Sequence, residues 1–126
     1  MAKICTDINQ SKQLAKILPI ESADMFWLVT SEPRLHVLTE PLSNYDRCEH
    51  YPAWSLSALL DVLPNNKKES STLSRGGWKI ETFEYLDKWW CEYEDESHTK
   101  DFSVSADNPI DACYELILKL HEKELL

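Results

Sequence analysis

The sequence predicts an α+β fold in which an antiparallel sheet of three to four strands packs between helices. Aromatic-rich, strand-like runs lie at about 78–85, 89–94 and 101–105, and the connections between them are short enough for an antiparallel meander. A helix with a clear start signal follows at Asn108, and an apolar stretch with helical spacing precedes the strands at 56–63. These elements together predict the α+β class.

The N-terminal residues predict one helix followed by two short strands. Thr6 or Asp7 offers a side-chain oxygen to cap a helix that we expect to run to about Leu18, before the following proline. Residues 25–29 are apolar and aromatic, which predicts a strand. Residues 35–38 predict a second, shorter strand.

The middle of the chain is interpreted as a loop, a helix and a second loop. Residues 43–52 are polar and irregular and contain a cysteine, a histidine and tyrosines, so this loop is the best suited to carry a site. Ser55 is then a plausible N-cap for the helix at 56–63, which a proline ends. Residues 65–77 are polar and end in two glycines, which predicts a loop.

The central strand of the meander predicts a sheet that is covered on both sides. Adjacent strand residues point to opposite faces, so burying both Trp89 and Trp90 requires cover on each face. We expect Trp89, Cys91 and Tyr93 to point inward, with polar side chains on the other face. The first two helices are expected to form one layer and the last helix the other, which is a layered α/β/α sandwich.

The last helix has the strongest local signal in the chain. Asn108 stands at the N-cap, and Pro109 follows at the first helical position, where its missing N–H costs no hydrogen bond. Asp111 then faces the positive end of the helix dipole. The expected apolar face consists of Ile110, Cys113, Tyr114, Ile117 and Leu120.

Composition excludes several classes of function. The 126 residues fit a single domain, 1–126, with no internal repeat. The only two glycines are adjacent, so neither a P-loop nor a dinucleotide-binding loop is present. The net charge of −9 opposes binding to nucleic acid or to an anionic membrane surface. Four widely spread cysteines and a polar N-terminus predict a cytoplasmic protein with free thiols.

Cysteine and histidine suggest two chemical hypotheses, a metal site and a thiol nucleophile. Cys48 and His50 are two residues apart, but the paired spacings of zinc sites are absent, and His36, His98 and His121 are isolated. As a nucleophile, Cys48 has acidic neighbours that oppose thiolate formation, and Cys91 is expected to pack in the core. We therefore assign no catalytic residue, no metal ligand and no cofactor.

Acidic and aromatic side chains in the strands suggest an interaction surface. Acidic residues are dense over 81–96, which fits a solvated outer face that discourages edge pairing. The same face could imitate the charge of DNA and occupy a basic groove on another protein. Five tryptophans are many for this length, and one exposed member of a pair could serve an interface. The interaction residues that we predict are Trp89, Trp90, Glu92 and Glu94.

Two segments carry a resemblance to known proteins. The leucine-rich stretch 52–60 and the helix start at 106–115 resemble small uncharacterised proteins from prophages and conjugative elements of gut anaerobes. Their combination with tryptophan-bearing strands is similar to the phage ABA sandwich domain. The resemblance covers about 52–122 and implies helix layers on either side of an antiparallel sheet. It implies no activity and no catalytic residues.

The sequence therefore favours a non-enzymatic accessory or protein-interaction role in a mobile genetic element. The expected partner is an unidentified protein, with a second copy of the chain as an alternative, and neither a nucleic acid nor a membrane. A second hypothesis is an acidic inhibitor or decoy of a host nuclease or DNA-binding protein. A third is a small enzyme that depends on Cys48 and His50.

Overall fold

The computed structural model shows an α+β protein that divides into two compact units, Met1–Val62 and Leu63–Leu126. The strands that the structure describes form one antiparallel sheet in each unit. The residues that the structure describes are 3–29, 34–37, 49–63, 77–83, 87–94, 101–124 and 126. Side chains of some strand residues, Glu94 among them, lie outside this description.

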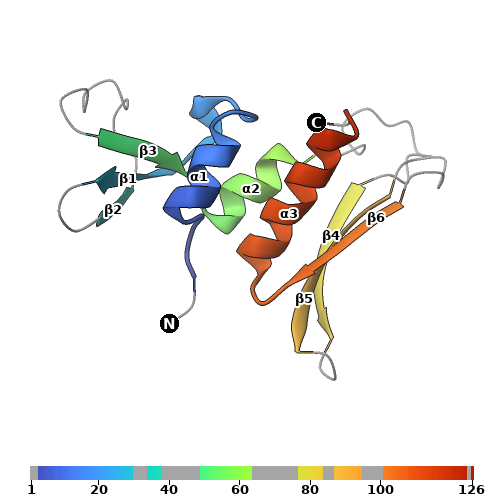
Figure 1. Ribbon diagram of the computed structural model, residues 1–126. Coiled ribbons are helices and arrows are strands. Elements are labelled where there is room, and N and C mark those ends of the chain that lie inside the picture. Colours follow the sequence, from blue (N-terminus) through green and yellow to red (C-terminus); the bar gives the residue numbers. More distant parts are fainter. Residues whose placement is uncertain are drawn as a thin grey trace. The chain divides into compact units, whose positions relative to one another are not determined.

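The first unit combines helices with a sheet of order β2-β1-β3 (Figure 1). Its strands pair antiparallel, and β1 is the central strand that bonds to both neighbours. The strand predicted at 25–29 is confirmed, as is the short strand at 35–38, which begins one residue earlier. The elements are α1 (Ile8–Leu14), the short 3₁₀ helix η1 (Ile20–Ser22), β1 (Met25–Val29), β2 (Arg34–Val37), β3 (Glu49–Ala53) and α2 (Leu56–Val62).

Local capping explains where α1 and α2 begin. The Asp7 carboxylate accepts the N–H of Gln10 at 2.8 Å, and the Gln10 side chain accepts the N–H of Asp7 at 3.1 Å. This reciprocal capping box fixes the start of α1. Ser55 Oγ accepts the N–H of Ala58 at 3.3 Å, so the predicted cap of α2 is confirmed. Helix α1 ends at Leu14, earlier than expected, and a hydrogen-bonded turn continues to Leu18.

The predicted loop at 43–52 is wrong over its last residues. Residues 49–53 form β3, which pairs along its length with β1 and includes His50, Tyr51 and Pro52. Proline interrupts a hydrogen-bonded ladder, which argues against a strand in the sequence, but an edge strand tolerates it. Since β3 pairs only with β1 among the described strands, it is such an edge. The part of the predicted loop at 43–48 lies outside the described residues.

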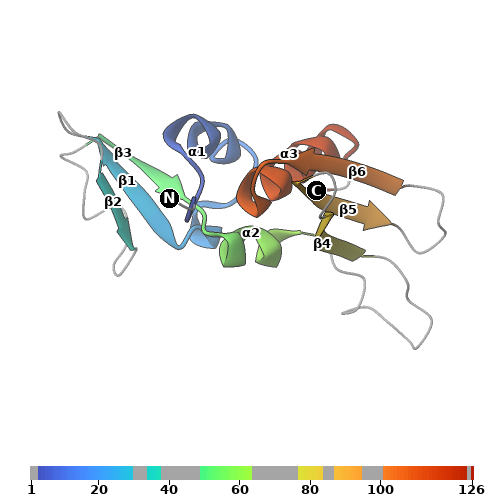
Figure 2. The same cartoon turned by 90° about the horizontal axis from the view of Figure 1, so that it is seen from below.

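The second unit is a meander of order β4-β5-β6 followed by a long helix (Figure 2). The predicted meander is confirmed, because β5 pairs antiparallel with both neighbours. Where the structure describes them, its boundaries agree with the predicted ones to within one residue. The elements are β4 (Gly77–Phe83), β5 (Lys88–Glu94), β6 (Asp101–Ala106) and α3 (Pro109–Glu122).

Helix α3 begins as the sequence predicts. The Asn108 side chain accepts the N–H of Asp111 at 2.9 Å and donates to the Asp111 carboxylate at 2.8 Å. Pro109 occupies the start of the helix. The predicted apolar face is confirmed except at Tyr114, which is half-buried, and the structure adds two residues to it. The buried positions are Ile110, Ala112, Cys113, Leu116, Ile117 and Leu120.

The sequence predicts one sheet, whereas the strands form two separate sheets. A period-2 pattern marks a strand but does not say which other strand it joins, so the pairing does not follow from it. The layered sandwich and the single domain over 1–126 both stay predictions. Among the described helices, none has the length and apolar character needed to cross a membrane.

Candidate functional site: the β4–β6 face opposite α3

Alternation along β5 separates a buried face from a polar one. Cys91 is fully buried and Tyr93 is 5% exposed, and α3 packs on β5, the strand that carries both. Lys119 of α3 lies with its Nζ 5.8 Å from the centre of the Phe102 ring, and Phe102 is the register partner of Tyr93. Since side chains alternate along a strand, the residues between these positions point to the face opposite α3. We call this face the outer face of the second sheet.

The outer face carries an indole and polar side chains in neighbouring positions. Trp90 pairs in register with Ser105, and Glu92 pairs with Ser103. Both serines are exposed, whereas Trp90 and Glu92 are half-buried. The Ser103 hydroxyl donates to Glu92 Oε1 at 3.4 Å, which orients the carboxylate across the two strands. These four residues, Trp90, Glu92, Ser103 and Ser105, define the candidate site.

The structure divides the predicted interaction residues between the two faces. Trp90 and Glu92 lie together on the outer face, two residues apart on β5. Trp89 is half-buried and alternates onto the face that α3 covers, as the sequence predicts. Glu94 pairs in register with Gly77 and Asp101 at the end of β5, and its side chain lies outside the described residues.

Sequence reasoning missed Ser103 and Ser105. The signal was present, because serines alternate with Phe102, Val104 and Ala106 over the last strand. Such strict alternation indicates a strand with one covered and one polar face. Had this alternation been applied to β6, Ser103 and Ser105 would have been placed beside the polar positions of β5.

Those histidines and cysteines of the metal-site and enzyme hypotheses that the structure describes lie on separate elements. His50 is half-buried on β3, where it pairs in register with Leu28. Cys48 and His98 lie outside the described residues, and so does the side chain of His36. His121 is exposed near the end of α3, with Nδ1 3.3 Å from the carbonyl oxygen of Leu126. Within the described ranges, no group of three or more His, Cys, Asp or Glu residues could hold a metal ion.

Two of the described cysteines, Cys5 and Cys113, sit in settings that favour the neutral thiol. Cys5, Cys91 and Cys113 are buried and free of disulfides. Burial raises the pKa of Cys5 to about 11, although Lys3 acts in the opposite direction. A hydrogen bond with Cys91, together with burial, raises the pKa of Cys113 far above its ordinary value. Because the thiolate is the nucleophile, neither Cys5 nor Cys113 is suited to nucleophilic catalysis in this fold.

Comparison with known protein families, with curated proteins and with solved structures finds no significant match.

Proposed function

We propose that this protein is a non-enzymatic interaction domain that binds a protein partner through the outer face of its second sheet. The observation that carries the proposal is the position of Trp90 beside Glu92, Ser103 and Ser105, on the face opposite α3. A half-buried indole offers a large apolar contact area, and tryptophan is enriched at the centre of interfaces. The two serines and the glutamate around it supply hydrogen-bonding groups of the kind found at an interface rim.

Charge indicates what kind of partner this face would accept. The whole chain carries a net charge of −9, with 22 acidic residues against 13 lysines and arginines. Glu92 places a carboxylate beside the indole on the outer face. A partner with a basic patch is therefore favoured, because complementary charge raises the association rate and disfavours wrong partners.

The setting of this function is part of the proposal. The resemblance of about 52–122 to proteins of prophages and conjugative elements supports an accessory role in a mobile genetic element. A cytoplasmic location follows from the same proposal, since a partner from the host would be met there.

Two glutamates allow a matched test of the binding face. Glu92→Lys changes the outer face, whereas Glu115→Lys makes the same change of charge at an exposed position of α3. Both variants and Trp90→Ala would be used, with wild type, to capture proteins from the native host. We expect Glu92→Lys and Trp90→Ala to lose a partner that wild type and Glu115→Lys retain. Equal capture by all four proteins would contradict the proposal, provided that circular dichroism shows each to be folded.

Acidic mimicry of nucleic acid is the second candidate function. The observation that favours it is the excess of acidic residues, which a DNA-binding groove would attract. In that case binding would depend on total charge, so Glu92→Lys and Glu115→Lys would weaken it equally. Affinity would also fall steeply between low and high salt, because exposed charges are screened. A loss of affinity confined to Glu92→Lys instead supports the interaction domain.

A further inference from the structure

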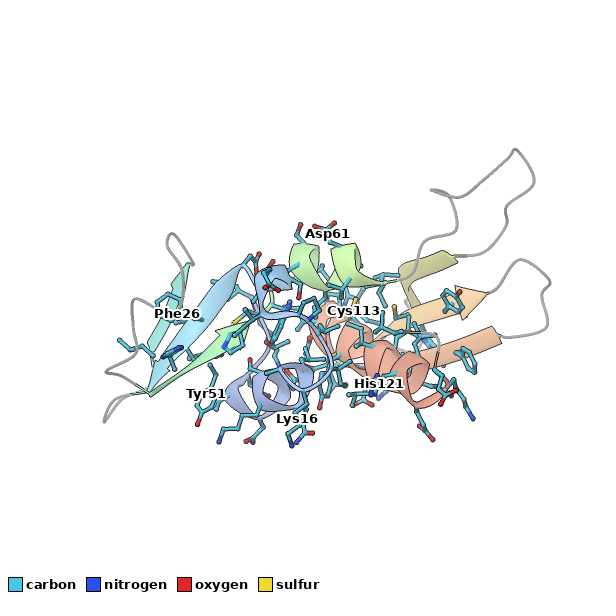
Figure 3. All side chains as sticks on the ribbon, turned by 90° about the horizontal axis from the view of Figure 1, so that it is seen from above. Lys16, Phe26, Tyr51, Asp61, Cys113 and His121 are labelled. Carbon is cyan, nitrogen blue, oxygen red and sulfur yellow. The ribbon has the colours of Figure 1, made fainter. Side chains whose placement is uncertain are left out.

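Cys91 and Cys113 form a pair of thiols inside the second unit. Cys91 lies in the middle of β5, where it pairs in register with Ile80 and Val104. Cys113 lies on α3, the helix that packs against β5 (Figure 3). Both side chains are 0% exposed, and the interaction with Cys91 raises the pKa of Cys113. The pair therefore connects the centre of the sheet to the helix that covers it.

We propose that Cys91 and Cys113 are a reversible disulfide site whose oxidation fastens α3 to the second sheet. The two buried thiols interact where α3 packs on β5, and a disulfide requires their sulfur atoms to approach to about 2.05 Å. The disulfide is uncharged, so it suits an apolar site without access to water. Because the two cysteines stand on different elements, the bond would also restrict the unfolded chain, which stabilises the folded state.

The oxidant is a small disulfide such as oxidised glutathione. One protein thiolate attacks a sulfur of the oxidant and forms a mixed disulfide, and one glutathione thiolate leaves. The second protein thiolate then attacks the protein sulfur of the mixed disulfide, forms the Cys91–Cys113 bond and releases the second glutathione. The two protons from the protein thiols end on the two glutathione thiols. Each protein sulfur loses one electron, and each glutathione sulfur gains one.

Burial makes this exchange depend on motion of α3. The hydrogen bond with Cys91 and burial raise the pKa of Cys113, so its thiolate is scarce while the helix is in place. An oxidant also cannot reach a side chain that is 0% exposed. Opening of α3 from β5 removes both obstacles. The site therefore reacts slowly in the folded protein and faster when the helix is loosened.

The double variant Cys5→Ala/Cys48→Ala isolates the pair, because the chain has four cysteines. It would be incubated with oxidised glutathione, both in buffer and in urea at its unfolding midpoint. The thiols that remain would then be alkylated, and the mass of the protein would be measured by mass spectrometry. We expect both thiols to disappear together, with a loss of about 2 Da and no lasting glutathione adduct. Oxidation should be at least about tenfold faster in urea, since both thiols are covered in the fold. The oxidised protein should also have the higher urea midpoint.

The control adds a third substitution, Cys113→Ala, to the double variant. Its single remaining cysteine, Cys91, has no partner thiol in the chain, so its reaction with oxidised glutathione stops at the glutathione adduct. Three outcomes would overturn the proposal. The first is that both thiols survive at the urea midpoint, where opening no longer limits the reaction. The second is an adduct that persists on Cys91 or Cys113 in the double variant. The third is an oxidised form with a lower urea midpoint than the reduced form. Each of these is measured on the double variant itself, so poor folding of the control does not affect them.

Discussion

The main-chain N–H of Trp54 donates to the side-chain hydroxyl of Thr6 at 3.1 Å, across 48 residues of sequence. In return the Thr6 N–H donates to the Trp54 carbonyl at 3.0 Å, and Trp27 Nε1 donates to the Thr6 carbonyl at 2.8 Å. The Thr6 hydroxyl also shares a 2.8 Å hydrogen bond with the hydroxyl of Ser11. Thr6 and Ser11 are both fully buried. Hydrogen bonds thus fix the N-terminal segment to the junction between β3 and α2.

Replacing the Thr6 hydroxyl should destabilise the first unit. Thr6→Val keeps the shape of the side chain but leaves the Trp54 N–H and the Ser11 hydroxyl without this partner. An unsatisfied buried polar group costs about 1–3 kcal/mol, so the free energy of unfolding should fall by about that amount. Urea unfolding followed by tryptophan fluorescence would measure it, because Trp27 and Trp54 both belong to this network.

Thr6→Ser provides the matched control, since serine keeps the hydroxyl and removes only a methyl group. We expect it to cost less than Thr6→Val. If serine proved more destabilising than valine, apolar packing and not hydrogen bonding would hold this segment.

Local signals account for the parts of the fold that the sequence predicts. Asn108, Pro109 and Asp111 identify the start of α3 because capping acts within one helical turn. The alternation of buried and polar residues on β5 likewise follows from the geometry of a strand, and Cys91 and Tyr93 are buried as expected. The candidate site depends on that alternation, which is why the sequence alone points to Trp90 and Glu92.

Long-range pairing accounts for the parts that the sequence does not predict. Strand β3 contains Pro52, which favours a loop on local grounds, but β1 pairs with it from Met25 to Val29. The contact between Thr6 and Trp54 joins segments far apart in sequence and leaves no periodic pattern. The division into two sheets depends on which strands pair with one another, and residue types alone specify that weakly.

Removing the cap of α3 should weaken the second unit. Asn108→Ala leaves the Asp111 N–H without its side-chain acceptor, and loss of an N-cap costs about 1 kcal/mol. Asn108→Ser retains an acceptor at the same position and should recover most of the stability. Urea midpoints of the three proteins test this order. Equal midpoints for alanine and asparagine would show that the cap contributes nothing measurable.

The predicted single domain over 1–126 can be tested by calorimetry. If the two compact units unfold as one cooperative domain, the protein should show one thermal transition with equal calorimetric and van't Hoff enthalpies. Two transitions would contradict the prediction. Thr6→Val and Asn108→Ala then serve as probes, because each lies in a different unit. In a cooperative domain both substitutions lower the temperature of the same transition.

The stability contributed by Cys5 should decrease in alkaline solution. Cys5 is 3% exposed, and burial raises its pKa from the ordinary 9.0 to about 11, with Lys3 opposing the rise and Asp24 and Asp7 adding to it. The folded protein therefore holds this proton more tightly than the unfolded chain does. The resulting stabilisation is complete below pH 9.0 and is lost as the pH rises through about 11.

The variant Cys5→Ala isolates this effect from the titration of other groups, which both proteins share. The difference between the urea midpoints of wild type and Cys5→Ala should be constant from about pH 7 to 8.5 and should shift in favour of alanine above about pH 9. A difference that stays constant up to about pH 11 would mean that the Cys5 thiol titrates alike in the folded and unfolded protein. The burial of this side chain beside Thr6, whose carbonyl accepts the thiol at 3.3 Å, argues for the pH-dependent result.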